Sequence, residues 1–133
     1  MVEIRYRDGL YTYKTKEAAI TKGMIATYTD NYEVGICNNK TRPIGVFTSP
    51  IPWDSPHQPA FSLAVGVATG LGEFKVDCFE EGTYKINDVV FCSPMGLITN
   101  NRKIGGPFSV GIVNYVQDDF IGFLTNYYPL PLK

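Results

Sequence analysis

Short apolar runs separated by turn residues fill the chain between residues 72 and 128, and no window there repeats apolar residues at helical spacing over three turns. Residues 73–79 alternate most regularly. Phe74, Val76 and Cys78 would share one side of an extended chain, with charged residues between them on the other. A period of two is typical of a half-buried strand. We therefore expect an all-β protein: a small antiparallel β-barrel of short strands with a proline-rich surface loop and extended termini.

Three further runs in this stretch are predicted strands: Asp88–Cys92, Phe108–Val116 and Phe120–Leu124. In the second of them, Phe108, Val110 and Ile112 are expected to face the same way. Ser93–Gly96 predicts a turn, because proline presets the backbone at its second position and glycine follows at its fourth. Asn100–Pro107 is predicted to be an open loop.

The first half of the chain carries similar but sparser signals. Gly23–Thr29 and Tyr32–Cys37 predict a hairpin with Asp30 and Asn31 at its tip. Two more strands are expected at Pro43–Thr48 and Phe61–Ala68. One short helical segment of one or two turns is expected at Thr15–Lys22, with Thr15 as its cap and Gly23 at its end.

Length and composition favour one soluble domain. A chain of 133 residues can bury one core, and its formal net charge of −1 offers no electrostatic footprint for nucleic acid or an anionic membrane. No run approaches the ~20 apolar residues of a membrane span. We expect an N-terminal arm or edge segment at 1–19, a barrel domain at 20–128 with a loop at 50–59, and a tail at 129–133.

A weak internal repeat is also visible. A unit beginning near Gly23 ends in the apolar-glycine-apolar step around Gly45, and a second unit beginning near Asn87 ends in a similar step around Gly111. Glycine within a strand often marks a bend or a close backbone approach. Two such units closing on each other would form a small barrel.

The sequence predicts no catalytic centre, cofactor or metal site. Its three cysteines (Cys37, Cys78 and Cys92) are widely spaced and are expected to be buried free thiols. The single histidine, His57, lies in the proline-rich loop without a zinc-binding set of ligands. Acidic pairs occur at predicted turns, where such residues are common.

Aromatic residues are the strongest functional signal. The candidate interface residues are Tyr6, Tyr11, Tyr13, Pro52 and Trp53. Tyrosine and tryptophan provide large contact areas at protein interfaces, and the neighbouring prolines would stiffen the segment that carries Trp53. Two alternatives stay open: Trp53 could fold back over the barrel as a lid, and the aromatics could stack nucleic-acid bases as in OB-folds.

The order of these segments resembles the capsid decoration, or cement, proteins of tailed phages. The resemblance rests on ITKGMIA (20–26), RPIGVF (42–47), the stretch from Gly72 to Thr99, PFSVGIVNYV (107–116) and a last strand at 120–124. Asn87-Asp88 stands where glycine-aspartate is usual in that family. The proline-rich segment at 50–59 and the tyrosine-rich N-terminal segment have no counterpart in its pattern.

The resemblance implies a non-enzymatic structural protein of the virion. Such a protein would be made in the host cytoplasm and would bind the major capsid protein on the outside of an icosahedral head as a homotrimer. It would stabilise that head without a cofactor and without contacting a membrane or nucleic acid. Two other functions are kept as alternatives: another virion part, such as a tail or head-fibre base domain, and a barrel that binds single-stranded nucleic acid.

Overall fold

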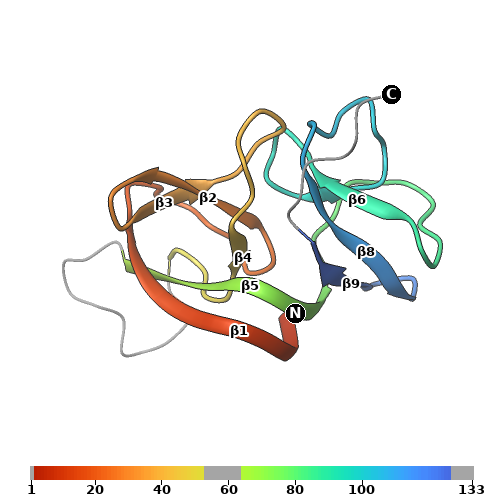
Figure 1. The fold of residues 1–133 in the computed structure, drawn as a ribbon, viewed down its shortest axis with the longest axis horizontal. Helices are drawn as coiled ribbons and strands as arrows, with labels where there is room; N and C mark the ends of the chain where they lie inside the picture. The colour runs from red at the N-terminus through yellow and green to blue at the C-terminus, as the bar shows by residue number, and fades with distance from the viewer. Residues whose placement is uncertain (1, 53–63, 127–133) are drawn as a thin grey trace.

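The structure is a computed structural model that describes residues 2–52 and 64–126, with side chains described from residue 11 onward. The described residues form nine strands and no helix, which confirms the all-β prediction (Figure 1). In chain order they are β1 (Val2–Thr15), β2 (Ile25–Asp30), β3 (Glu33–Ile36), β4 (Gly45–Phe47), β5 (Ala64–Val76), β6 (Val89–Cys92), β7 (Ile98–Thr99), β8 (Ser109–Val116) and β9 (Ile121–Thr125).

Five of the strands close into a barrel, as predicted. The ring runs β1-β3-β2-β4-β5 and returns to β1, because β1 pairs with both β3 and β5. All of these pairings are antiparallel except β1 with β3, which is parallel and limited to two residue pairs, Lys14 with Glu33 and Thr15 with Val34. The segment expected as an N-terminal arm or edge therefore supplies the strand that closes the barrel.

The remaining strands extend the sheet from β5 in the order β9-β8-β6-β7. They form the second half of the molecule, on the right of Figure 1, and β5 is the strand that both halves share. Just after β5 the chain pairs with β7, where Phe79 and Ile98 form a parallel bridge. The Ile25 N–H of β2 also donates to the Gly96 carbonyl, in the turn after β6, at 2.9 Å, so the two halves are joined through the backbone at more than one point.

Two strands are much longer than the sequence suggests. β5 runs for 13 residues, so the segments expected separately at 61–68 and 73–79 belong largely to one strand that ends at Val76. Gly70 lies between them with a φ of +75°, a value that glycine adopts without strain. The strand therefore continues through this irregular backbone position. β1 runs for 14 residues along β5.

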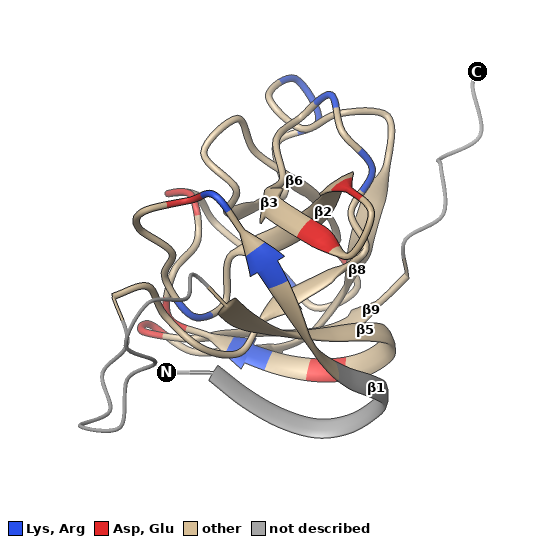
Figure 2. Ribbon diagram, turned by 90° about the vertical axis from the view of Figure 1, so that its left-hand side faces the viewer, with Lys and Arg blue, Asp and Glu red and all other residues tan. Residues whose placement is uncertain are grey.

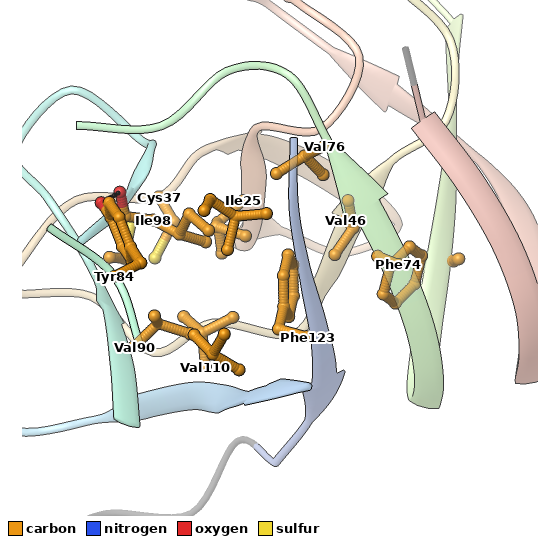
Figure 3. Close-up of a cluster of buried hydrophobic side chains, with 14 residues drawn as sticks. Ile25, Cys37, Val46, Phe74, Val76, Tyr84, Val90, Ile98, Val110 and Phe123 are labelled. Carbon is orange, nitrogen blue, oxygen red and sulfur yellow. Dashed lines mark hydrogen bonds between the residues drawn. The ribbon is translucent and has the colours of Figure 1, made fainter. Parts of the chain in front are cut away.

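Buried side chains fall into two clusters. One fills the barrel and includes Ala26, Phe47 and Val67; the other lies between the barrel and the second half. Ile25 and Val46, which neighbour the first set along β2 and β4, point the other way and join the second cluster (Figure 3). β4 and the first half of β2 are therefore buried on both faces, which explains why they show no apolar–polar alternation.

The internal repeat has a counterpart in topology. In the first unit β2 pairs with β3 and β4, and in the second β6 pairs with β7 and β8, so each unit places its first strand between the other two. A Cβ added at Gly45 would lie 2.5 Å from the Ala68 carbonyl oxygen, and one added at Gly111 would lie 2.3 Å from that of Leu124. The units do not close on each other, however: they lie in different halves.

The prediction of a short helical segment at Thr15–Lys22 is wrong. Thr15 ends β1, and its hydroxyl accepts a hydrogen bond from the Glu17 backbone N–H at 3.2 Å. Ile20 then exchanges two backbone hydrogen bonds with Ile51, at 2.7 and 2.8 Å. A segment this short has marginal helical stability, so pairing with the distant chain prevails.

The expected face of β8 is also wrong in part. β6 pairs with β8 through Val90 with Gly111 and then Phe91 with Ser109, which leaves Val110 as a bulge. The bulge reverses the alternation, so Val110 and Val113 are buried whereas Ile112 is exposed. The hairpin of β2 and β3 and the turn at 93–96 lie where they were expected, and Gly96 donates to the Ser93 carbonyl at 3.0 Å.

Candidate functional site

Two of the predicted interface residues lie together on β1. Tyr11 pairs with Val67 of β5 and Tyr13 pairs with Val65. Residues paired across a sheet share a face, and both valines are completely buried in the barrel cluster. Tyr11 and Tyr13 therefore lie on the face of β1 that lines the barrel interior.

The β2–β3 hairpin brings two more tyrosines to the same place. Tyr28 pairs with Val34, which also belongs to the barrel cluster, and Tyr32 lies in the hairpin turn. Because β1 pairs with β3 only at Lys14 and Thr15, the two elements part beyond that point and leave an opening into the barrel. Tyr11, Tyr13, Tyr28 and Tyr32, which we call the tyrosine cluster, surround this opening.

Aromatic contacts hold the centre of the cluster. The Tyr13 and Tyr28 hydroxyls are hydrogen-bonded at 2.9 Å, and their rings meet edge to face with centroids 5.6 Å apart. The Tyr11 ring lies 6.3 Å from that of Tyr13. Burial, followed by the hydrogen bond to Tyr28, raises the pKa of Tyr13 to about 12, so this phenol stays neutral across the physiological range.

The rim of the cluster is open to solvent. Tyr11, Tyr28 and Tyr32 are 55%, 52% and 81% exposed, whereas Tyr13 is half-buried. Tyr32 also has a φ of +55°, in the left-handed region that glycine and asparagine normally occupy. A tyrosine in this conformation costs roughly 1–2 kcal/mol, and its ring gains little from packing here.

The cluster encloses a cavity of about 460 Å³, within the range of small ligand sites. Thr12 and Asn31 complete its lining, so that no charged side chain among the described residues forms its wall. The surface offers aromatic faces, phenolic hydroxyls and one amide. Such a set can stack against flat or apolar groups and form neutral hydrogen bonds.

The other predicted interface residues are not part of this cluster. Tyr6 lies further along β1, paired with Glu73, and its side chain is not described. Pro52 is exposed and lines a separate cavity of about 780 Å³ with the bridged pair Ile20 and Ile51. Trp53 and His57 lie outside the described residues, so the alternatives of an anchor and a lid for Trp53 stay untested.

The thiols are free and mostly buried. Cys37 and Cys92 are buried and hydrogen-bonded to each other, and Cys78 is half-buried. The hydrogen bond to Cys37 and burial raise the pKa of Cys92 well above its usual range, and burial raises that of Cys78 to about 11. Thiolates are the reactive form of cysteine, so neither Cys78 nor Cys92 has the character of a nucleophile.

Sequence reasoning missed Tyr28 and Tyr32 as site residues. Both fell inside the predicted hairpin, and the available signal was the position of Tyr32 directly after Asp30 and Asn31, at a tip that tolerates few bulky side chains. A large aromatic residue at such a tip contributes little to folding, which makes it a candidate for binding.

No family model, curated protein or solved structure matches this chain. Among the residues that the structure describes, no group of three or more histidine, cysteine, aspartate or glutamate side chains could hold a metal ion. The same residues include no helix with the length and apolarity needed to cross a membrane.

Proposed function

We propose that this chain is a structural binding protein of a tailed phage, a capsid decoration protein that attaches to the outer surface of the head and stabilises it. The resemblance in segment order suggests this class, and it also implies a homotrimer that contacts the major capsid protein. The observation that carries the proposal is the tyrosine cluster, an exposed aromatic surface built on a closed barrel.

The barrel that carries the tyrosine cluster is rigid, which suits binding through a preformed, complementary surface. Strands β2, β4 and β5 have buried residues on both faces, so the barrel has little freedom to deform when it docks. Tyrosine provides contact area at a low cost in side-chain entropy. Many copies bound to a symmetric lattice would together contribute far more than one contact, because each bound copy links several shell subunits.

Nucleic acid is a weaker candidate ligand for this surface. The exposed tyrosines could stack bases, but no charged side chain lines the cavity, and Figure 2 shows cations and anions interspersed on this side of the molecule. Binding to phosphates normally depends on clustered lysine and arginine side chains. A salt-dependent shift of the protein with a single-stranded oligonucleotide would favour this alternative.

Cosedimentation tests the proposal. The protein is expected to pellet with expanded shells of the encoding phage and to leave isolated capsid monomers in the supernatant. A double variant, Tyr11→Ser with Tyr32→Gly, should reduce the bound fraction at least about tenfold, because large aromatic anchors dominate such interfaces. Met95→Ser is the matched control, because Met95 is 68% exposed in the other half of the molecule. Binding to monomers alone would contradict the proposal.

Light scattering tests the implied trimer separately. A homotrimer contains three copies of the 14.8 kDa chain, and the measured mass should stay at that value on dilution through the working range. A monomer in free solution that becomes ordered only on the shell would remove the trimer from the proposal but keep the decoration role.

A further inference from the structure

We propose that the open edge of β1 beside the tyrosine cluster binds a short, uncharged, extended peptide segment of a partner protein, which joins the barrel as an added strand. This inference deepens the proposed function and rests on it for the identity of the partner. The bound segment would belong to a shell protein and would lie beside the tyrosine cluster. Addition of a strand to an exposed edge is a recurrent mode of peptide recognition.

The edge itself follows from the pairing of β1. This strand is paired with β5 along its length but with β3 only at Lys14 and Thr15. On its other side, the part of β1 from Gly9 to Tyr13 faces no strand among the described residues. An unpaired edge presents backbone donors and acceptors that can template another chain.

The direction of these backbone groups can be worked out. The Lys14 N–H donates to the Tyr32 carbonyl of the hairpin at 3.1 Å, so residue 14 directs its backbone groups away from β5. Pairing with β5 is regular from Gly9 to Lys14, and alternate residues of a strand direct their N–H and C=O groups to the same side. Thr12 and Leu10 therefore direct theirs toward the open side.

The partner residue on β5 supports this assignment. Thr12 lies opposite Gly66, whose carbonyl accepts from the Thr48 N–H at 2.9 Å and whose N–H donates to the Ser49 hydroxyl at 2.9 Å. Gly66 therefore directs both backbone groups away from β1. Thr12 and Gly66 form a non-hydrogen-bonded pair, and the Thr12 N–H and C=O are available on the open edge.

The shape of the edge limits its occupant to a short segment. The β2–β3 hairpin occupies the position beside Lys14, where a strand on this edge would otherwise continue. The available edge spans Gly9 to Tyr13, room for about five residues at 3.3 Å per residue. A second copy of β1 is 14 residues long and would meet the hairpin, so a loop or terminal arm of a partner fits better.

The lining of the cavity sets the chemistry of that segment. Tyr11, Tyr13, Tyr28 and Tyr32 would contact its side chains, while Thr12 would contact its backbone. The wall among the described residues is uncharged, and a charged side chain entering it would lose hydration without a partner. Apolar or small polar residues are therefore expected. The strained backbone of Tyr32 is an independent sign of selection for binding at this rim.

A displayed library of random seven-residue peptides, selected on the intact protein, tests the proposal. The selected peptides should be uncharged and rich in β-formers. Amide hydrogen exchange should show that the synthetic peptide protects the N–H groups of Thr12 and Leu10, which exchange fast in the free protein. The N–H groups of Tyr11 and Tyr13, which face β5, should be protected with or without the peptide.

A matched pair of variants separates backbone pairing from side-chain contact. Thr12→Pro removes the outward N–H without removing a hydrogen bond to β5, and proline is tolerated on edge strands. It should weaken the peptide about tenfold or more, because the peptide carbonyl loses its donor. Thr12→Val keeps the N–H and should bind within about threefold of the parent chain. Melting curves identify any loss of fold in either variant.

Several results would overturn the proposal: no selected peptide, equal binding by Thr12→Pro and Thr12→Val, or unchanged exchange of Thr12 and Leu10. Protection that appears with protein concentration alone would assign the edge to a second copy, and protection by an oligothymidine would assign it to nucleic acid. Peptide binding without shell binding would retain the edge site and refute only the decoration role. Shell binding that survives in Thr12→Pro would retain the decoration role and refute the edge site as its basis.

Discussion

The turn after β2 and the turn after β6 occupy the same place in two units with the same strand order, yet they have opposite surroundings. The first exposes Tyr32 to solvent at the rim of the tyrosine cluster. The second is partly buried against the first unit: the Gly96 carbonyl accepts from the Ile25 N–H at 2.9 Å, and a Cβ on Gly96 would lie 2.2 Å from Ile36. One turn therefore joins the halves, whereas the other leaves Tyr32 exposed, as the proposed binding role requires.

The residues in the two turns follow from these roles. Gly96 has a φ of +82° and no room for a side chain, so glycine meets both the conformational and the steric demand. Tyr32 has a similar φ of +55° but carries a large, exposed ring. In the second unit, glycine occupies the left-handed backbone position without strain. In the first unit, a strained tyrosine occupies it, as is expected where a residue is selected for binding and not for stability.

The largest expected effect tests whether the halves fold as one. Phe123 lies in the cluster between the halves, stacked on Phe74 with centroids 5.7 Å apart, and Phe47 lies in the barrel cluster. Phe123→Ala and Phe47→Ala should each lower the free energy of unfolding by about 3–5 kcal/mol. Chemical denaturation followed by tyrosine fluorescence and by far-ultraviolet circular dichroism should give one coincident transition in both variants. Two separate transitions would show that the halves are independent domains.

The turn of the second unit should be the next most sensitive position. Gly96→Ala places a Cβ against Ile36 in a conformation that L-residues rarely adopt, and it should cost about 2–4 kcal/mol. The loss can be measured by the shift of the denaturation midpoint at constant slope. Pro94→Ala, at an exposed position of the same turn, is the control and should cost less than about 1 kcal/mol. A tolerated Gly96→Ala would mean that this turn does not join the halves.

Sequence patterns recovered the elements whose packing is simple. Phe74 and Val76 alternate with half-buried residues and were assigned correctly, because one face of that segment meets the core. β4 and the first half of β2 are buried on both faces, so these residues show no period that reveals which of them faces which cluster. The bulge at Val110 depends on pairing with β6, which no local pattern encodes.

The site was only half visible in the sequence for a similar reason. Tyr11 and Tyr13 stood out by composition, but their neighbours depend on a ring closure between β1 and β3, which are joined by only two residue pairs. That closure brings Tyr28 and Tyr32 beside them and leaves Pro52 at another cavity. Contacts between segments distant in the chain cannot be read from either segment alone.

A gain in stability is expected at the tip of the first unit. Tyr32→Gly relieves the left-handed backbone and should raise the free energy of unfolding by about 0.5–1 kcal/mol, while it weakens shell or peptide binding. Asn87→Gly is the matched control, because Asn87 has a φ of +76° but asparagine tolerates this region, so its effect should be smaller. Thermal melts of the three proteins compare them. A destabilised Tyr32→Gly would indicate that the ring contributes to folding after all.

The smallest effect concerns the pH dependence of the two shielded phenols, one in each half. Tyr13 in the tyrosine cluster and Tyr84 in the second half both have a pKa raised from 10.0 to about 12, in each case mainly by burial. The folded state therefore holds these two protons more tightly than the unfolded chain does. Their contribution is complete below pH 10 and is lost as the pH rises through 12, so stability should fall across that window.

The two phenols can be told apart by removing one neighbour. Tyr28→Phe deletes the hydroxyl bonded to Tyr13, the second cause of its raised pKa, and should move the Tyr13 titration toward 10.0 without affecting Tyr84. Tyr84 donates instead to the Glu80 carbonyl at 2.7 Å, far from the cluster in sequence and in pairing. At neutral pH the variant should change stability by no more than about 0.5 kcal/mol, because the bond is exposed. Tyrosinate absorbance resolves the shift, and an unchanged Tyr13 titration would mean that burial alone, and not the contact between β1 and the hairpin, holds its proton.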